Sequence, residues 1–439
     1  MIPLVKISFV LTLFFFLCSC LGPVKELKYQ IEDSLEDSAS FEDNPTPLVD
    51  LDNKFDILAQ SKLSLSGDSK RNFKLAFSDD KVFYASEDGL VSCLNIINNE
   101  ILWDFRHQEK ILAGLTADSK NIYFVDYEGY LNALSIKGFL EWRSFVGEVF
   151  APPLVSGDSV IIRSSSNRFI SLNTIDGQEL WSYQLPIPTL SIRSWGEMSL
   201  KDNVLYSGIS SGKIIALNVS DGTLIWEGTY SQPKGSSEIE RSNDTTSKPV
   251  VDDSIVYIVA NSGNVAALSR ADGGVLWARP LSSFVGMGTD NEMLYITHNS
   301  GSIYAVDKES NKVKWRNSDF LGRDVSKPLF YKNNVIISDY EGYLHFLDNK
   351  TGQALARIKV SSSILLEPIV IQDSENLVIC SITGDIMIIA INSIEYKAKV
   401  KNEADEKTNL NDDINDEEKI QAKSAQDDES IIDTLIFWD

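Results

Sequence analysis

The sequence has few of the residues from which metal and redox sites are built. Its 439 residues include four cysteines and three histidines. The histidines, His107, His298 and His345, are scattered without metal-ligand spacing, and no Cys-x-x-Cys pair occurs. The sequence therefore predicts no metal site and no dithiol redox centre.

Positive charge is also scarce. Lysine and arginine total 40 against 63 aspartates and glutamates, which gives a formal net charge of −23. Such an excess of negative charge argues against nucleic acid as a partner and against adsorption to anionic lipid. Much of the charge lies in two acidic stretches that flank the centre of the chain.

The one long apolar run lies at the N-terminus. The run ISFVLTLFFFLCSC ends at Cys20, is too short for a confident membrane span and fits a signal peptide. Its end, LCSC, resembles a bacterial lipobox, which implies a signal peptide over residues 1–19 and acylation of Cys20, palmitate included. An ordinary signal peptide or an uncleaved anchor are the alternatives. Leu21 follows Cys20 where enteric bacteria use Asp for inner-membrane retention, which favours the outer membrane.

The acidic stretches have compositions typical of disorder. Residues 20–55 are interpreted as a tether between the lipid and the folded centre, and residues 397–439 as a tail. The tail ends in the apolar sequence IIDTLIFWD. That ending is either a short partner-docking motif or a segment that folds back onto the rest of the protein.

The centre of the chain is repetitive. GKIIALNVSDGTLIWEG begins at Gly212, and related copies begin at Gly89, Gly129, Asn167, Gly263, Gly301, Gly342 and Gly384. Each copy predicts two short strands around a turn, because pairs such as Asp221-Gly222 tolerate the positive φ of tight hairpins. Upstream of several copies a proline starts another strand-like pair, at Pro153, Pro249, Pro328 and Pro368.

The unit is thus four strands in roughly 40 residues, repeated eight times. A four-stranded sheet buries both faces when it is stacked radially between two others. We predict an all-β, eight-bladed β-propeller of antiparallel blades over residues 56–396; seven blades plus an odd hairpin is the alternative. The last repeat lacks a clear fourth strand, so the segment Asp56–Ser66 is expected to supply it and close the ring.

The tryptophans recur at one position of the repeat, usually 14 residues after its first residue. They suggest either an aromatic cage or, more simply, packing between blades, which we favour. Trp195 lies outside the register and is expected to be more exposed. Cys93 and Cys380 fall in the first and last blades, where we expect two separate buried thiols rather than a disulfide.

Finer features carry a family resemblance. The repeats look like those of quinoprotein-type propellers, and the stretches LPIPTLSIRSWGE, GSSEIERSNDTTSKPVV and DYEGYLHFLDNKTGQ resemble the BamB family of the outer-membrane β-barrel assembly machinery. The resemblance implies that Leu190, Ile192 and Arg193 contact the POTRA domains of a BamA-type barrel subunit. It also implies a contact at Asp244, although Thr246 stands where the family has a second Asp. The acidic tail is not a family feature.

Three classes of function come into question: a scaffold, a dehydrogenase and a ligand-binding surface protein. The resemblance implies a non-catalytic scaffold without cofactor, with unfolded outer-membrane proteins as further partners through strand addition. It places the protein at the outer membrane, facing the periplasm. A quinone-dependent dehydrogenase would need adjacent cysteines and a calcium site, and the sequence has no adjacent cysteines. A surface-displayed propeller that binds a ligand is the remaining alternative.

Overall fold

The structure, a computed structural model, describes residues 45–390 except 56, 71–72, 187–195, 232–244, 246 and 372–375. Every regular element in these residues is a β-strand, and the strands form eight four-stranded antiparallel sheets. None of the described residues forms a helix suited to crossing a membrane.

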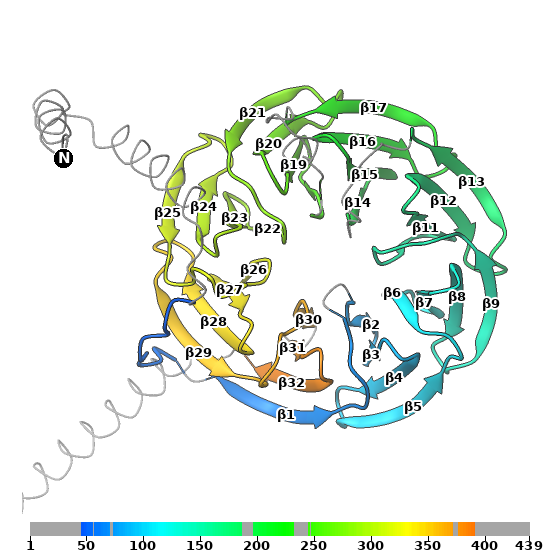
Figure 1. Cartoon of the computed structure of the whole chain (residues 1–439), viewed down its shortest axis with the longest axis horizontal. Helices are drawn as coiled ribbons and strands as arrows, with labels where there is room; N and C mark the ends of the chain where they lie inside the picture. Colours follow the sequence, from blue (N-terminus) through cyan, green and yellow to red (C-terminus); the bar gives the residue numbers. More distant parts are fainter. Residues whose placement is uncertain are drawn as a thin grey trace, which may run out of the picture.

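The eight sheets are the blades of a closed propeller around a central axis (Figure 1). The inner strands and the residues just before them line cavities at this axis, which we call the central channel. From the channel outward they are blade I, β2 (Ala76–Ser78), β3 (Lys81–Ala85), β4 (Leu90–Asn95) and β5 (Glu100–Arg106); blade II, β6 (Ile111–Ala117), β7 (Asn121–Asp126), β8 (Tyr130–Ser135) and β9 (Leu140–Phe145); blade III, β10 (Leu154–Ser156), β11 (Ser159–Arg163), β12 (Arg168–Asn173) and β13 (Glu179–Gln184); and blade IV, β14 (Met198–Lys201), β15 (Val204–Ile209), β16 (Lys213–Asn218) and β17 (Leu224–Thr229). They continue with blade V, β18 (Val250–Val251), β19 (Ile255–Val259), β20 (Asn264–Ser269) and β21 (Val275–Pro280); blade VI, β22 (Met287–Thr289), β23 (Met293–Thr297), β24 (Ile303–Asp307) and β25 (Val313–Asn317); blade VII, β26 (Leu329–Tyr331), β27 (Asn334–Ser338), β28 (Tyr343–Asp348) and β29 (Ala354–Lys359); and blade VIII, β30 (Ile369–Ile371), β31 (Asn376–Cys380), β32 (Asp385–Ala390) and β1 (Leu58–Ser64). The predicted eight-bladed fold is confirmed, and the alternative with seven blades is wrong.

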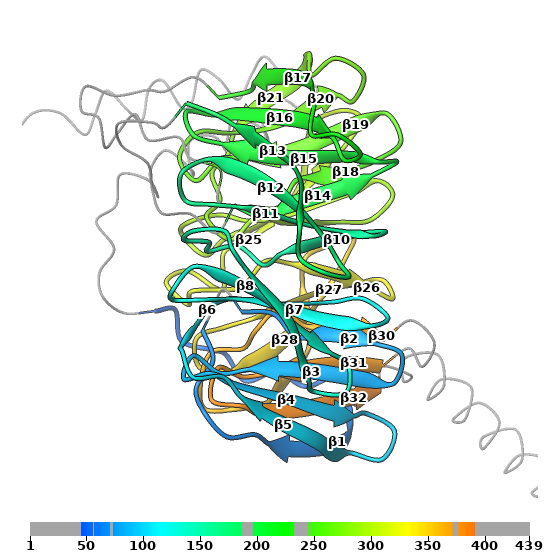
Figure 2. The same ribbon diagram turned by 90° about the vertical axis from the view of Figure 1, so that its right-hand side faces the viewer.

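The core is divided among the blade interfaces. Eight apolar clusters each combine residues of two neighbouring blades, including the cluster between blades VIII and I. Seen from the side, the strands of the ring form a thick disc (Figure 2). Each sheet therefore buries both faces on its neighbours, as the repeat arithmetic requires.

The ring closes where the sequence predicted. β1 pairs antiparallel with β32, from Leu58 opposite Ala390 to Ser64 opposite Asp385, and becomes the outermost strand of blade VIII. The first strand of the chain thus completes the last blade, which joins both ends of the repeat array in one sheet.

The repeated tryptophans pack between blades, as predicted. Each of the six donates its indole N–H to a carbonyl of the next blade, at 2.7–3.1 Å. Trp226, for example, donates to Arg270 O at 2.9 Å and covers the turn at Gly273, where an added Cβ would lie 2.5 Å from the ring. Glycine is thus required in this Asp-Gly turn for two reasons. Its φ is +73°, and the indole ring leaves no room for a Cβ.

The strand register places large side chains next to small ones within a blade. In blades I, II, IV, V and VI an aromatic residue of the second strand, a small residue of the third and the Trp of the fourth are cross-strand neighbours: Phe83–Cys93–Trp103, Tyr123–Ala133–Trp142, Tyr206–Ala216–Trp226, Tyr257–Ala267–Trp277 and Tyr295–Ala305–Trp315. Blade VII inverts the pattern, since Ala356 stands at the Trp position and the large Phe346 lies opposite it.

The missing Trp of blade VII is offset by the N-terminal segment Pro45–Phe55, which we call the strap. Phe55 is buried and meets Phe346 edge-on, with ring centroids 5.5 Å apart. Lys54 donates its N–H to Leu355 O at 2.8 Å, and Asn53 pairs with the N–H and C=O of Arg357. The last part of the acidic tether is therefore held against the outer strand of blade VII, which composition alone did not indicate.

Replacing Phe55 by Ala should release the strap. The loss of one buried phenylalanine is expected to lower the free energy of unfolding by about 1.5–3 kcal/mol, without a lasting cavity because the strap can detach. Hydrogen exchange should accelerate at the Arg357 amide, which donates to Asn53 Oδ1. Val49→Ala, in the same segment but exposed, should change neither measurement. Slow exchange at Arg357 in the Phe55 variant would contradict the assignment.

The two cysteines of the propeller are free and buried, as predicted. Cys93 lies on β4 in the cluster between blades I and II, whereas Cys380 lies on β31 in the cluster between blades VIII and I. Burial raises the pKa of the Cys93 thiol to about 12 and also raises that of Cys380. Both side chains therefore act as small apolar core groups rather than as nucleophiles.

Candidate functional site

The residues expected to contact a partner lie outside the described residues. Leu190, Ile192 and Arg193 fall within 187–195, and Asp244 falls within 232–244. Trp195, expected to be exposed, and Cys20, the expected acylation site, also lie outside the described residues. The two inner segments connect the outer strand of one blade to the inner strand of the next, β13 to β14 and β17 to β18. Because strands alternate in direction within each blade, connections of this kind all begin and end on one face of the propeller.

The described ends of these connections are firmly held. Leu185 is buried and donates its N–H to Asn167 O at 3.1 Å. Tyr230 and Thr245, on either side of 232–244, are both buried and share a hydrogen bond between their hydroxyls. One connection joins blades III and IV and the other joins blades IV and V. The buried residues at their ends thus fix where both leave the propeller.

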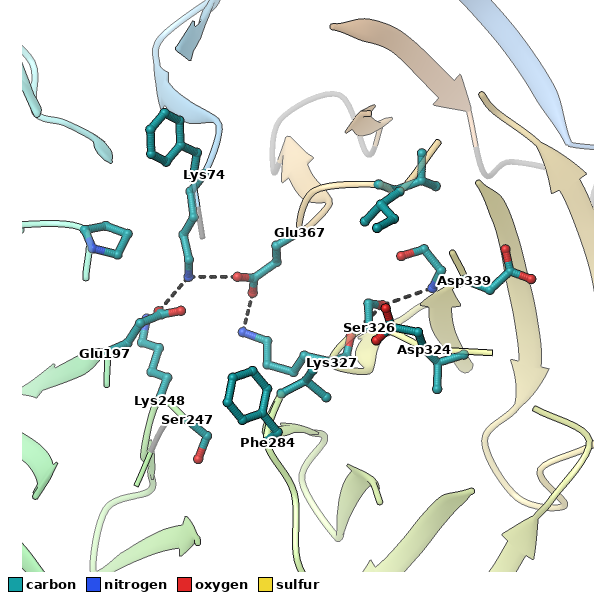
Figure 3. Close-up of a pocket in the computed structure, with 17 residues that line it drawn as sticks. Lys74, Glu197, Ser247, Lys248, Phe284, Asp324, Ser326, Lys327, Asp339 and Glu367 are labelled. Atoms are coloured by element: carbon teal, nitrogen blue, oxygen red, sulfur yellow. Dashed lines mark hydrogen bonds and ion pairs between the residues drawn. The ribbon is translucent and has the colours of Figure 1, made fainter. Parts of the chain in front are cut away.

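The central channel carries a second candidate site, which sequence analysis missed. Lys74 Nζ lies 2.6 Å from Glu197 and 2.7 Å from Glu367, and Glu367 also pairs with Lys327 (Figure 3). These residues come from blades I, IV, VII and VIII, so the ion pairs span the channel. The repeat does offer a signal, because each stands just before the inner strand of its blade.

Charges in this network stabilise one another. Burial opposes ionisation of Lys74, yet Glu197 and Glu367 raise its pKa overall. Burial would raise the pKa of Glu367, but Lys74 and Lys327 hold it well below the usual range. Lys248, also in the wall, has a lowered pKa because of burial and repulsion from Lys74 and Lys327.

The channel does not fit the quinone cofactor found in dehydrogenases with related propellers. Two cavities that the described residues of the channel line measure about 120 and 250 Å³, below the ~300–1,000 Å³ typical of small-molecule sites. Lys248, Lys327 and Glu367 line both cavities. The adjacent cysteines that the resemblance would demand are absent from the sequence.

The histidines have structural partners. His345 Nε2 lies 3.0 Å from Asp339, and burial lowers the pKa of its ring. Asp339 also accepts hydrogen bonds from Arg323, which in turn donates to Thr46 O of the strap. Within the described part of the chain, no three His, Cys, Asp or Glu side chains are grouped to hold a metal ion.

The outer rim of the propeller exposes apolar side chains next to strand edges. On the outer strands of blades I–V, or directly before them, the following are 42–67% exposed: Ile101, Leu102, Phe139, Leu140, Leu180, Leu224, Ile225, Val275 and Leu276. Among the described residues, the strands β5, β9, β13, β17 and β21 pair on one side only. Blade VII differs because the strap lies along β29.

The comparisons with known proteins assign the family. A family model described as outer membrane protein assembly factor BamB matches residues 87–317. The BamB of Nitrosomonas eutropha is 33% identical over 311 residues, covering 70% of this chain and 74% of the relative. The chain belongs to the BamB family. The resemblance inferred from the inter-blade stretches is thereby confirmed.

Solved structures agree on the fold. BamB from Moraxella catarrhalis has a TM-score of 0.70 and 24% identity, and the match covers 76% of this chain and all of that one. A quinohemoprotein alcohol dehydrogenase from Comamonas testosteroni has a TM-score of 0.63 at 12% identity, covering 78% of each chain. These likenesses establish the propeller alone. Membership of the BamB family, whose members are named assembly factors, separates this chain from the dehydrogenases.

Proposed function

We propose that this protein is a non-catalytic scaffold lipoprotein of the outer-membrane β-barrel assembly complex. Acylation of Cys20 anchors it to the outer membrane, and residues 20–55 tether the propeller on the periplasmic side. The propeller docks on the POTRA domains of a BamA-type subunit and assists the folding and insertion of outer-membrane proteins. The single observation that carries this proposal is membership of the BamB family.

The docking element is the connection between blades III and IV. Leu190 and Ile192 fill an apolar pocket of the partner, and Arg193 gives a directional charged contact, a combination typical of interface hot spots. Asp244, in the next connection of the same kind, extends the contact. The buried ends of both connections, at Leu185 and at Tyr230 with Thr245, support a rigid presentation of this face.

The outer rim of blades I–V is the surface for unfolded outer-membrane chains. An incoming β-strand can pair with the free edge of an outer strand while its apolar side chains cover residues such as Leu224 and Ile225. The strap supports this mode, because an extended segment already hydrogen-bonds to the outer strand of blade VII.

Co-purification tests the scaffold role against the alternative of a surface-displayed ligand-binding lipoprotein. The tagged protein is captured from gently solubilised membranes and its partners are identified. We expect a large barrel protein with POTRA repeats in stoichiometric amount. Its reproducible absence, with the tagged protein intact and membrane-bound, would refute the proposal and favour the alternative.

Charge reversal at Arg193 should weaken docking and leave folding intact. Arg193→Glu places like charges against each other and is expected to cost about 2–5 kcal/mol of binding free energy if the contact is buried, roughly a 30-fold or greater loss of affinity. Binding of the purified propeller to isolated POTRA repeats, with thermal melts alongside, gives both quantities. Leu190→Ala and Ile192→Ala should weaken binding with less dependence on salt.

The control is Lys350→Glu, the same change of charge at an exposed turn between β28 and β29. It should bind like the unaltered protein. Unchanged affinity in Arg193→Glu would remove this connection from the interface. A collapsed Tm would instead make Arg193 a structural residue.

A further inference from the structure

The acidic tail closes with an apolar stretch, residues 431–438, which we call the tail segment. Its sequence, IIDTLIFW, consists mostly of large apolar residues and contains neither proline nor glycine. Isoleucine, phenylalanine and tryptophan are favoured in strands, and an apolar segment of this kind with little charge readily pairs with an open sheet edge. The segment therefore fits a partner that offers both a strand edge and apolar side chains.

The outer strand of blade I, β5, offers such an edge. Among the described residues it pairs with β4 on one side only. His107, directly after β5, donates its N–H to Gly89 O at 2.8 Å, and alternate residues of an antiparallel strand face the same partner. The N–H groups of Asp104 and Arg106 consequently point outward, away from β4.

The tail leaves the propeller on the face where this edge begins. β32 ends at Ala390, which lies opposite Leu58, the first residue of β1. In the other blades the corresponding end of the third strand leads through a turn into the outer strand. Ile101 and Leu102, each 45% exposed, lie at the start of β5 and thus on this same face of the ring.

Blade I is the first free neighbour that the tail meets. It shares an apolar cluster with blade VIII, and β1 and β5 follow one another along the outside of the ring (Figure 1). β29, on the other side of blade VIII, carries the strap. The described exposed residues of β1 itself are small or polar, namely Ala59, Lys62 and Ser64. Residues 391–430, at roughly 3.3 Å per extended residue, allow a reach on the order of 100 Å.

We propose that the tail segment adds to the free edge of β5 as a fifth strand of blade I. Its backbone pairs with the outward groups of β5, and its apolar side chains cover Ile101 and Leu102. An open strand edge and an uncovered apolar segment are each an aggregation hazard, and the added strand removes both. The occupant is thus a part of this chain, not a separate protein.

The strap is the precedent within the same molecule. It is an extended segment from outside the repeats, and it reaches the outward groups of an outer strand, with Lys54 donating to Leu355 O and Asn53 bonding Arg357. Its Phe55 enters the core because Ala356 leaves room there. Blade I has a Trp at that position, so the tail segment has to lie on the surface of the blade.

The edge of β5 belongs to the rim proposed above to receive unfolded outer-membrane chains. The tail segment would therefore compete with such chains at blade I. The pairing itself does not rest on that function, because it concerns two parts of one chain in the absence of any partner. Failure of the pairing leaves the scaffold role intact, and failure of the scaffold role leaves the pairing intact.

Hydrogen exchange on the full chain, with and without residues 431–439, tests the pairing. The outward amides of Asp104 and Arg106 should exchange about tenfold or more faster after the deletion, because strand pairing protects them. Deletion of residues 411–419 removes the same number of residues from the acidic stretch and keeps the tail segment. This control should exchange as slowly as the full chain.

Blade IV provides the matched edge. Tyr230 donates its N–H to Gly212 O, so the amides of Glu227 and Thr229 point outward from β17 as those of Asp104 and Arg106 do from β5. Their exchange should be the same in all three proteins. Slow exchange at Glu227 and Thr229 that is lost with residues 431–439, without a change on β5, would refute blade I as the site.

A substitution on the rim tests the side-chain contact without shortening the chain. Leu102→Glu places a charge under the tail segment, and because Leu102 is exposed the propeller should stay folded. Exchange at Asp104 and Arg106 should rise as in the deletion, whereas Leu224→Glu, the equivalent change on blade IV, should leave it slow. The proposal is overturned if these amides exchange equally fast with and without the tail segment. Protection that grows with protein concentration would also overturn it, because the segment would then pair with a second copy.

Discussion

Deletion of Asp56–Ser66 is expected to open the ring and to lower Tm sharply. The deletion removes β1, which pairs with β32 from Leu58 to Ser64 and carries the buried Leu65 behind it. Loss of the buried Leu65 costs about 1.5–3 kcal/mol, and loss of the partly buried Leu63 and of the β-ladder adds to this. The sum is a large share of the ~5–15 kcal/mol that stabilises a typical domain.

The exposed edge should also make the variant aggregate. Without β1, β32 presents a row of unpaired N–H and C=O groups, a template for pairing with another chain. Melting and light scattering during refolding measure the two effects. An unchanged Tm after the deletion would show that the ring does not depend on β1.

A matched pair of proline substitutions separates the contribution of the β1–β32 hydrogen bonds from that of the side chains of β1. Leu65 donates its N–H to Gly384 O, and alternate residues of an antiparallel strand face the same partner. The N–H of Leu63 therefore points to β32, whereas that of Lys62 points outward. Leu63→Pro should approach the deletion in effect, and Lys62→Pro should be mild, because a proline is tolerated where the edge faces solvent.

The architecture was predictable because the same turn, packing and strand-opening residues recur along the chain. Tryptophans recur in six of the eight copies, and Asp-Gly turns and strand-opening prolines in several, at nearly constant spacing. The errors of single-strand prediction therefore average out over the copies. Closure by β1 was predictable for a different reason. The repeat from Pro368 lacks a clear fourth strand, and a strand-like segment directly precedes the first repeat.

The strap and the channel network were not predictable in this way. The strap lies in an acidic segment whose composition indicates disorder, and it folds because blade VII has Ala356 in place of a Trp and leaves room for Phe55. The ion pairs join Lys74 of blade I to Glu197 of blade IV, 123 residues later in the chain. A repeat defines neighbours around the ring, but it does not say which side chains are long enough to meet across the channel.

The candidate docking residues were predicted on different grounds. Leu190, Ile192, Arg193 and Asp244 were inferred from a family resemblance and not from packing, because nothing in blade geometry requires those sequences between β13 and β14 or between β17 and β18. The structure describes the ends of the two connections, and the docking role of the residues between them stays a prediction. The Trp positions are different, since packing alone accounts for them.

Truncation of Trp226 to Ala is therefore expected to cost stability and not binding. The side chain is buried between blades IV and V, where it covers Gly273 and donates its indole N–H to Arg270 O. Its ring centroid lies 5.9 Å from that of Tyr206. Small residues on both sides, Ala216 and Gly273, cannot fill the space that it leaves. The free energy of unfolding should fall by about 3–5 kcal/mol, as for other buried aromatic residues replaced by Ala.

The control lies two residues away on the same strand. Leu224 is 42% exposed on the rim, and Leu224→Ala should change the free energy of unfolding by no more than about 0.5 kcal/mol. The two substitutions make opposite predictions for function, because Trp226 supports the ring whereas Leu224 belongs to the rim proposed to receive unfolded chains. Denaturant unfolding and binding of an unfolded outer-membrane protein, measured on both variants, test the division. A stable Trp226→Ala protein that loses binding would make the Trp a ligand contact and would end the packing interpretation.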